Sequence, residues 1–354
     1  MRRALLRPPC LVSFSGGRDS SALLAVATEM ARQDGLPLPI PVTLVFPESA
    51  AAEEEEWQKI VLGHLGLDDW VRIDIRHELG AVGPVAATAL RRHGLLWPCN
   101  THFHLPIVQR ASGGSVVTGF GGDEIALSSA TARAERVMGR LVRPRAGDIL
   151  SLGFAATPRS VRAVVYNRRA LAEVSGLPWL TPGGVRAISR SLGDMNARKP
   201  FGWESVVRQW IWRSRYFRVC TRSFAVMADF HDVEVFHPFV APEVLDALGR
   251  AGGFSGLGTR TELMGRLFGD LLPDEVVQRQ TKGVFTDPVW TPATSRFARS
   301  WSGGGIDLPP IDAERLRRHW MSERPDPRST VLLQMAWLHD DSIGADATIA
   351  PDVP

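Results

Sequence analysis

The amino-acid sequence predicts an α/β protein built on a doubly wound parallel sheet and followed by a large helical C-terminal half. Short apolar runs alternate with helical patterns over residues 1–127, and two of these runs end in glycine-rich loops. Residues 128–343 then show mostly helical spacing with Pro and Gly interruptions. We therefore expect an α/β region at 1–127, a mainly helical region at 128–343 that completes the functional site, and a flexible tail at 344–354.

The predicted elements follow from the spacing of apolar residues. Apolar, β-rich runs predict four strands, at residues 10–14, 40–46, 71–75 and 115–119. Apolar residues at helical spacing predict the helices between them, at residues 21–33, 53–66, 78–93 and 103–111. Strands joined by helices in this way form a parallel sheet with right-handed crossovers. The loops after such strands meet at the carboxyl edge of the sheet, where ligands bind.

The composition is that of an ordinary globular chain, and it narrows the classes of function. The 354 residues are 44% hydrophobic and 22% charged, and the net charge is +3. Apolar stretches are too short to span a membrane, and Arg7, Pro8 and Pro9 interrupt the first one, so no export signal is expected. The cysteines lie far apart and form no disulfide framework, CxxC pair or zinc ribbon. These features favour the cytoplasm.

Lysine is rare in this chain. Of the 41 Lys and Arg residues, only Lys59, Lys199 and Lys282 are lysines, a bias that coding preference explains. Because a planar guanidinium cannot replace a compact ammonium at every site, each remaining lysine is of greater interest.

The strongest local signal is Ser15-Gly16-Gly17-Arg18-Asp19-Ser20, between a predicted strand and a predicted helix. The glycines allow a tight turn that brings backbone N–H groups close to a ligand, and the helix adds its positive dipole end. Ser15 and Ser20 add hydroxyl donors, so the loop suits a dense anion such as pyrophosphate. The loop matches neither GxxxxGK[ST] nor GxGxxG, which argues against kinases, GTPases and nicotinamide-binding enzymes.

Asp19 within this loop indicates a metal. A carboxylate beside bound phosphates repels them unless a cation lies between, and Mg²⁺ held by one or two carboxylates is the natural bridge. A second acidic loop, Thr118-Gly119-Phe120-Gly121-Gly122-Asp123-Glu124, follows the fourth predicted strand. We therefore expect the two loops to meet at the carboxyl edge of the sheet around a metal-bound phosphate.

These loops resemble those of a known family. SGGRDS resembles the pyrophosphate-binding loop (PP-loop) of N-type ATP pyrophosphatases, and TGFGGDE resembles the second loop of their asparagine synthetase and β-lactam synthetase branch. Residues 233–239, which end in Pro-Phe, and LLPDEVVQRQTKGVF at 271–285 are similar to two further motifs of this branch. The resemblance covers residues 10–300 and implies an adenine nucleotide alpha hydrolase-like fold and a synthetase domain.

The resemblance implies an ATP-dependent, AMP-forming amide ligase. A substrate carboxylate would attack the α-phosphorus of ATP, pyrophosphate would leave, and an amine or ammonia would displace AMP from the acyl-adenylate. The resemblance places Lys282 against the charge on the α-phosphate and the tetrahedral intermediate, and Mg²⁺ on Asp19 and Asp123. It assigns the pyrophosphate to Ser15, Gly16, Gly17 and Ser20, and the adenosine to Phe14, Val45, Thr118 and Gly119.

The N-terminal end departs from the family. Most members begin with a glutamine-hydrolysing domain whose nucleophilic Cys follows the initiator Met, whereas here Arg2 follows Met1 and the first motif starts at Ser15. We expect the chain to lack its own glutaminase. The nitrogen would then come from free ammonia, from an amine on a second substrate, or from a partner protein.

Phe120 is a second departure, because asparagine-forming relatives carry Glu at this position and β-lactam formers carry Tyr. A phenylalanine has no proton acceptor, so it cannot act as the base. Glu124, His237 and His102 are the candidates to replace it, unless the amine arrives neutral and needs no base.

A third departure is the insert at about residues 128–205, which is longer than the asparagine synthetases suggest. It would shape a pocket for a bulky substrate or dock a partner protein. By analogy alone, bulky acyl substrates resemble those of amide formers in natural-product and antibiotic pathways, including lasso-peptide cyclases.

Three lesser features have plainer interpretations. His102 and His104 lack further ligands for a metal and are interpreted as core or pocket lining. The acidic run 53–56 is interpreted as a first helical turn favoured by the helix dipole. The Trp- and Arg-rich segment 203–218 has apolar residues at helical spacing, which favours a helix core over a nucleic-acid platform or a grip on a substrate carboxylate.

Two other functions stay open. A tRNA-modifying PP-loop ATPase would share the first loop, but the chain has neither a CxxC pair nor a strongly basic balance, so nucleic acid is not the favoured partner. A non-catalytic partner in a biosynthetic complex would explain Phe120, although such a protein has no need of Asp19, Asp123 and Lys282 together.

Overall fold

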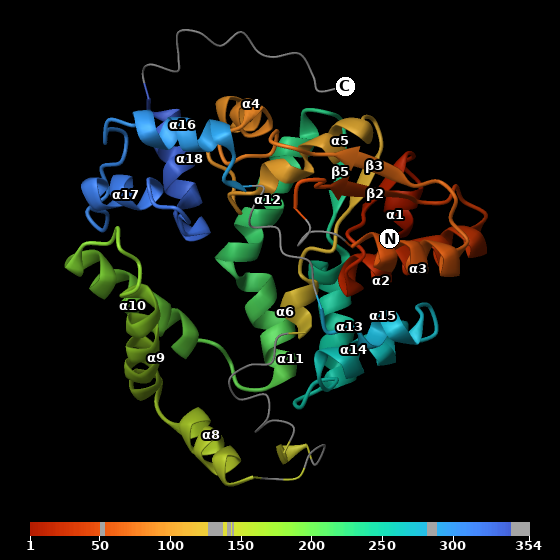
Figure 1. Ribbon diagram of the computed structural model, residues 1–354. Helices are drawn as coiled ribbons and strands as arrows, with labels where there is room; N and C mark the ends of the chain where they lie inside the picture. Colours follow the sequence, from red (N-terminus) through yellow and green to blue (C-terminus); the bar gives the residue numbers. More distant parts are fainter. Residues whose placement is uncertain (50–53, 127–136, 140–142, 144, 282–288, 341–354) are drawn as a thin grey trace.

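The computed structural model describes residues 1–49, 54–126, 137–139, 143, 145–281 and 289–340. Its centre is a parallel five-stranded sheet in the order β3-β2-β1-β4-β5 (Figure 1). The strands are β1 (Cys10–Ser13), β2 (Ile40–Val45), β3 (Val71–Asp74), β4 (Ser115–Val117) and β5 (Glu234–Phe236). The prediction of a doubly wound α/β fold is confirmed.

Helices cover both faces of the sheet, because neighbouring strand residues point to opposite sides. Val12 and Phe14 pack into the core that α2 (Arg18–Asp34) and α3 (Glu55–Leu65) share with helices from the C-terminal half. Leu11 and Val116 point to the opposite face, covered by α4 (Pro84–His93), α5 (Leu105–Arg110) and α12 (Arg215–Asp229). A short helix, α1 (Arg2–Leu5), docks beside β4, where the Ser115 hydroxyl donates to the carbonyl of Ala4 at 2.7 Å.

The structure adds one strand that the sequence pattern did not indicate. β5 has three residues, too few for a visible alternation, and pairs with β4 in parallel register from Ser115↔Glu234 to Val117↔Phe236. The helix expected at 78–93 begins at Pro84, and the one expected at 103–111 is divided into the 3₁₀ turn η2 (Thr101–His104) and α5. The sheet of the N-terminal region is therefore completed from the C-terminal half.

The C-terminal half is mainly helical in its described residues. Its elements follow α6 (Gly122–Ala126), the last helix of the N-terminal region. They include α8 (Ala146–Ala156), α9 (Arg159–Val174), α10 (Pro182–Ala197), α11 (Trp203–Ser205), the π-helix η3 (Val206–Ile211), η4 (Pro238–Val240), α13 (Pro242–Gly252), α14 (Arg260–Phe268), α15 (Asp274–Gln278), α16 (Pro292–Ser300), α17 (Ala313–Trp320), η6 (Pro327–Ser329) and α18 (Thr330–Leu338). In Figure 1, α8–α10 form an arm that leaves the sheet and returns to it through α11. The tip of the α9–α10 hairpin is held at residues 179–181, where the backbone bonds to residues 310–312 near α17. Among the described residues, no helix is long and apolar enough to cross a membrane.

The interpretation of 203–218 as a helix core is confirmed. Trp203, Val207, Ile211 and Phe217 are buried, and they pack with α13 and α14. Trp212 lies on the opposite side of this segment and is 52% exposed.

Candidate functional site

The first glycine loop closes on itself between β1 and α2. The Ser20 hydroxyl donates to the carbonyl of Gly17 at 3.0 Å and accepts the backbone N–H of Ser15 at 3.2 Å. Gly16 takes a φ of +78°, and a Cβ there would lie 2.9 Å from Cγ of Gln58 on α3. Gln58 in turn donates to the carbonyl of Ser15 at 3.2 Å. The loop is thus fixed at the N-terminus of α2, with its amides at the positive end of that helix.

The second glycine loop packs directly on the first. A Cβ at Gly119 would lie 3.5 Å from Cβ of Asp19, and one at Gly122 would overlap the carboxyl group of Asp19. Gly121 has a φ of +95°, and a Cβ there would overlap Val240. The expected meeting of the two loops at the carboxyl edge is therefore seen in the structure, and it depends on the absence of a side chain at Gly122.

Arg260, the first residue of α14, links the two loops. Its guanidinium donates to Oδ2 of Asp19 at 2.6 Å and forms a second, very short bond with the carboxylate of Asp123. Thr259 and Glu262 form a capping box that fixes the start of α14 and hence the position of Arg260. The sequence offered no signal for this residue, because arginine is common in the chain and Arg260 is 241 residues from Asp19.

The two carboxylates fit the metal that the sequence suggested. Mg²⁺ is usually bound by one or two carboxylates together with phosphate oxygens and water, so a third protein ligand is not required. Among the described residues no cluster of three or more His, Cys, Asp or Glu side chains could hold a metal ion by itself. The Asp19–Asp123 pair is therefore suited to a cation that arrives with a phosphorylated ligand, and Arg260 compensates the two charges without it.

A buried ion pair between Arg279 and Glu54 supports the first loop. Arg279 donates to Oε1 of Glu54 at 2.6 Å and to the carbonyl of Gly16 at 3.0 Å, and its guanidinium lies over the ring of Trp57. The Arg279 and Glu54 side chains are 3% and 6% exposed. Within the acidic run 53–56, Glu54 is thus a loop support, while Glu55 pairs with Lys59 and Arg72 at the surface. Arg279 belongs to the family-like motif at 271–285, and this motif was the feature of the sequence that could have indicated its role.

The two loops open into a cavity of about 740 Å³, here called the loop cavity. Of the residues predicted for the site, those that line it are Ser15, Gly17, Asp19, Ser20, Thr118, Gly119, Asp123 and Glu124. Lys282 lies outside the described residues. The two described residues before it, Gln280 and Thr281, line the loop cavity.

The two remaining positions predicted for adenosine differ in exposure. Val45, at the end of β2, lines a separate cavity of about 400 Å³ together with Glu54 and Gln58, the side chains that support the first loop. Phe14 is buried in the core behind the loop, where its carbonyl accepts the Thr43 hydroxyl at 2.7 Å. Val45 can therefore contact a ligand, whereas the Phe14 side chain supports the loop from the core.

The candidate bases lie in different surroundings. Glu124 lines the loop cavity, but His102 does not: its ring is fully buried and both nitrogens face backbone carbonyls, of Cys99 and Leu79. His237 lies beside the cavity, with Nδ1 2.6 Å from the Thr118 hydroxyl, and burial lowers its pKa to about 3. A base with so low a pKa is weak at neutral pH.

Phe120 and His104 belong to an aromatic floor of the loop cavity. The Phe120 ring contacts the rings of Phe224 and His237, and His104 stacks edge-on against Phe224. Burial lowers the pKa of His104 to about 4, so the floor is uncharged at neutral pH. His104 is thus pocket lining, as the sequence interpretation proposed.

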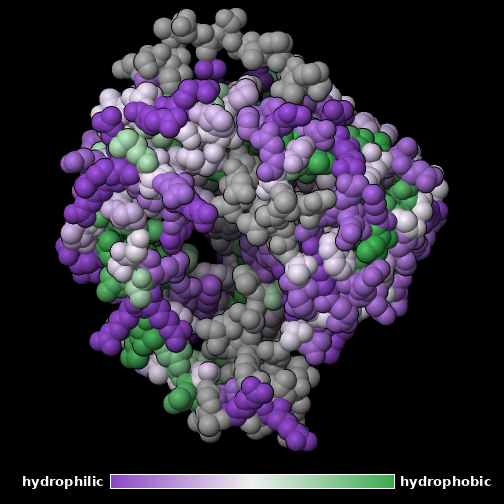
Figure 2. Space-filling view, in the orientation of Figure 1, coloured by the Kyte–Doolittle hydropathy of each residue, from purple (hydrophilic) through white to green (hydrophobic). Residues whose placement is uncertain are grey.

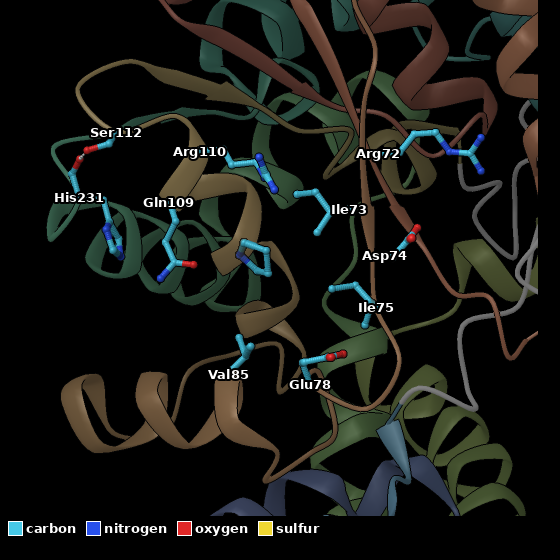
Figure 3. A pocket seen from close by; sticks show the side chains of 11 residues that line it. Arg72, Ile73, Asp74, Ile75, Glu78, Val85, Gln109, Arg110, Ser112 and His231 are labelled. Atoms are coloured by element: carbon cyan, nitrogen blue, oxygen red, sulfur yellow. Dashed lines mark hydrogen bonds between the residues drawn. The ribbon is translucent and has the colours of Figure 1, made fainter. Parts of the chain in front are cut away.

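A further cavity of about 480 Å³ lies at the outer edge of the sheet, between β3, α4 and α5 (Figure 3). No residue predicted for the site lines it. Two acidic side chains, Asp74 and Glu78, line it, and Glu78 already accepts the backbone N–H groups of Arg76 and His77, at 2.7 and 3.0 Å. This cavity is separate from both glycine loops.

The fold and the two loops define an α/β protein with a site for a phosphorylated ligand at the carboxyl edge of a parallel sheet. The family model described as asparagine synthase matches residues 2–339, and the chain belongs to this family. The family consists of ATP-dependent ligases that form amide bonds, so the chain is a ligase that uses ATP. No curated protein gives a significant match to the chain.

Proposed function

We propose that this protein is an AMP-forming amide ligase of specialised, natural-product or antibiotic biosynthesis. It adenylates a substrate carboxylate with ATP and transfers the acyl group to an amine or to ammonia. The observation that carries the proposal is the direct packing of two glycine loops whose carboxylates, Asp19 and Asp123, share one arginine. The family membership supports the same chemistry.

In the proposed mechanism the first loop holds the leaving group. Backbone N–H groups of residues 15–17 and the hydroxyls of Ser15 and Ser20 bind the β- and γ-phosphates, while Thr118, Gly119 and Val45 contact the adenosine and Phe14 supports it from the core. Mg²⁺, when bound at Asp19 and Asp123, neutralises phosphate charge. A carboxylate oxygen of the substrate attacks the α-phosphorus, and the bond to pyrophosphate breaks. Lys282 is proposed to stabilise the negative charge on the α-phosphate.

In the second step the nitrogen of the amine attacks the carbonyl carbon of the acyl-adenylate. The carbon–nitrogen bond forms, the bond to AMP breaks, and the nitrogen loses a proton. We propose Glu124 as the acceptor of this proton, because it is the one candidate base that lines the loop cavity. Phe120 then serves as part of the aromatic floor and needs no role in proton transfer.

The nitrogen donor and the cellular setting complete the proposal. We propose that the amine or ammonia reaches the site from a second substrate, from solution or from a partner protein. The acid and the amine are small molecules or peptides, and the reaction takes place in the cytoplasm. Nucleic acid is not a proposed partner; retention of the protein on tRNA at moderate salt would favour the tRNA-modifying alternative instead.

ATP–pyrophosphate exchange with a panel of carboxylic acids tests the proposal. We expect acid-dependent exchange that falls by about 10²–10³-fold in Lys282→Ala, the usual effect of removing a preorganised charge, and that is also strongly reduced in Asp123→Asn. Asp246→Asn is the matched control, because Asp246 pairs with Arg208 and Arg250 at the surface. Exchange that persists unchanged in Asp123→Asn contradicts the site assignment, and ATP binding without exchange for any acid favours the non-catalytic partner.

A further inference from the structure

A second cavity, here called the side pocket, lies between the arm and the segment 206–217 and has a volume of about 460 Å³. In the space-filling view the molecule is hollowed between the α9–α10 side and α12 (Figure 2). Most of the pocket wall is apolar or aromatic. Both tyrosines of the chain line it, and its aromatic residues are Phe154, Tyr166, Phe201, Trp210, Tyr216 and Phe217.

The side pocket adjoins the loop cavity. Glu124 and Tyr216 line both cavities, so the same two side chains form the boundary between them. A ligand whose reacting group lies beside Asp123 and Glu124 can therefore extend past Tyr216 into the side pocket.

The side pocket also has an excess of positive charge, because Arg162 and Lys199 line it together with one carboxylate, Glu124. Lys199 follows α10 and lines the wall with an exposed side chain, and partial desolvation lowers the pKa of its ammonium. Within the described part of the chain, no acidic side chain pairs with Lys199 and no group accepts a bond from Nε of Arg162, a buried atom. Two cationic side chains beside an aromatic wall are suited to an anionic ligand, which can form charge-assisted hydrogen bonds with them.

The backbone of the pocket is unusual as well. Val206–Ile211 forms a π-helix, and Val206, Trp210 and Ile211 from this turn line the wall. Single π-helical turns are rare and occur frequently at functional sites, because they redirect side chains at a cost in helix stability. Here the redirected side chains face a cavity.

We propose that the side pocket binds the body of the carboxylic acid that the loop cavity activates. The acid has a bulky aromatic or aliphatic framework and carries a second acidic group, which pairs with Lys199 and Arg162. This inference rests on the proposed function, since it assumes that one carboxylate reacts beside Asp123. It explains why a lysine remains at position 199 of an arginine-biased chain, because a compact ammonium fits beside an aromatic wall.

Direct binding in the absence of ATP tests the pocket apart from the reaction. The probes are benzylsuccinate, 4-phenylbutanoate, which lacks one carboxylate, and succinate, which lacks the ring; affinities are measured by calorimetry with the full chain. We expect benzylsuccinate to bind at least about tenfold more tightly than either of the others, as expected for a charge-assisted bond added to apolar burial. In Lys199→Gln its affinity falls to that of 4-phenylbutanoate.

Lys59→Gln is the matched control, because Lys59 pairs with Glu55 on the exposed side of α3. Arg162→Gln provides a second variant if Lys199→Gln fails to fold, and it weakens benzylsuccinate in the same direction. Equal affinity for the three probes, no binding of benzylsuccinate, or equal losses in Lys199→Gln and Lys59→Gln overturns the proposal. The exchange assay on the wild type separates the two hypotheses. Selective binding of benzylsuccinate without any exchange contradicts only the proposed function, and exchange without selective binding contradicts only the side pocket.

Discussion

The two glycine loops and the α8–α10 arm differ in how tightly the rest of the molecule holds them. Three side chains fix the first loop: Gln58 of α3 binds Ser15, Arg260 of α14 binds Asp19, and Arg279 after α15 binds Gly16. The arm is held mainly at the tip of its hairpin and at α11, and it leaves apolar side chains such as Leu150 and Val164 exposed. The glycine loops, where the proposed phosphate chemistry occurs, are therefore held rigidly. The arm, where the proposed substrate is selected, is less constrained and is free to vary.

The largest effect is expected when the buried support of the first loop is removed. Arg279→Met leaves Glu54 buried without a partner, so we expect the free energy of unfolding to fall by about 3–5 kcal/mol in urea titrations. Arg250→Met is the control, since Arg250 forms an exposed pair with Asp246 and should cost about 0–1 kcal/mol. Similar losses in both variants would show that the loop is not held by this pair.

A methyl group between the two loops is the next test. Gly122→Ala places a Cβ against the carboxyl group of Asp19, which cannot move freely because Arg260 binds it. We expect a loss of about 3 kcal/mol, the upper end of the cost of overpacking, measured by urea unfolding. Gly63→Ala in α3 meets no atom within 4 Å and should instead stabilise the protein by about 0.5–1 kcal/mol. Equal effects at both positions would contradict the close packing of the loops.

The aromatic floor predicts a pH dependence that the arm lacks, because residues 145–205 contain no histidine. Burial lowers the pKa of His104 from 6.5 to about 4, so the unfolded chain binds its proton at a higher pH than the folded protein. This contribution to stability is therefore complete above pH 6.5 and declines as the pH falls toward 4. When the pH is lowered from 7 to 5, the proton equilibrium of His104 alone should reduce the free energy of unfolding by about 2 kcal/mol.

The measurement is the free energy of unfolding of wild type and His104→Gln at both pH values. On acidification from pH 7 to pH 5, the free energy of unfolding should fall by about 2 kcal/mol less in the variant than in the wild type. This difference does not depend on the stability of the variant at pH 7. His319→Gln is a useful control, because His319 is only partly buried and lies in the last turn of α17, away from the loop cavity. An unchanged pH dependence in His104→Gln would show that His104 is not held neutral.

Local patterns predicted most of the loop region. The strands before Ser15 and Thr118 are apolar runs, and glycines between a strand and an acidic helix start specify a phosphate-binding turn. Since parallel strands end at one edge, the meeting of Asp19 with the second loop also followed from the sequence. β5 escaped prediction, because three residues are too few to show a period.

Local sequence patterns could not predict the arginines that complete the site. Arg260 and Arg279 lie 241 and 263 residues from the atoms they bind in the first loop. Arginine is so common in this chain that its presence at these two positions does not distinguish them from other arginines. The insert was expected either to shape a pocket or to dock a partner protein. The wall of the side pocket combines α8–α10 with a π-helical turn that no periodicity indicates. Tertiary contacts of this kind are set by packing, and packing is not visible in apolar spacing.

The smallest expected effect tests the arm itself. Gly153 lies within α8, and a Cβ there meets no atom within 4 Å, so Gly153→Ala should stabilise the protein by about 0.5–1 kcal/mol through the unfolded state. Gly184→Ala is the control within the same arm: its Cβ would overlap Pro310, where the start of α10 packs on the segment before α17, and we expect a loss instead. Urea unfolding followed by circular dichroism measures both. Opposite signs at these positions would confirm that the arm is held at its tip and free along α8, whereas a loss at Gly153 would mean that α8 packs as tightly as the glycine loops do.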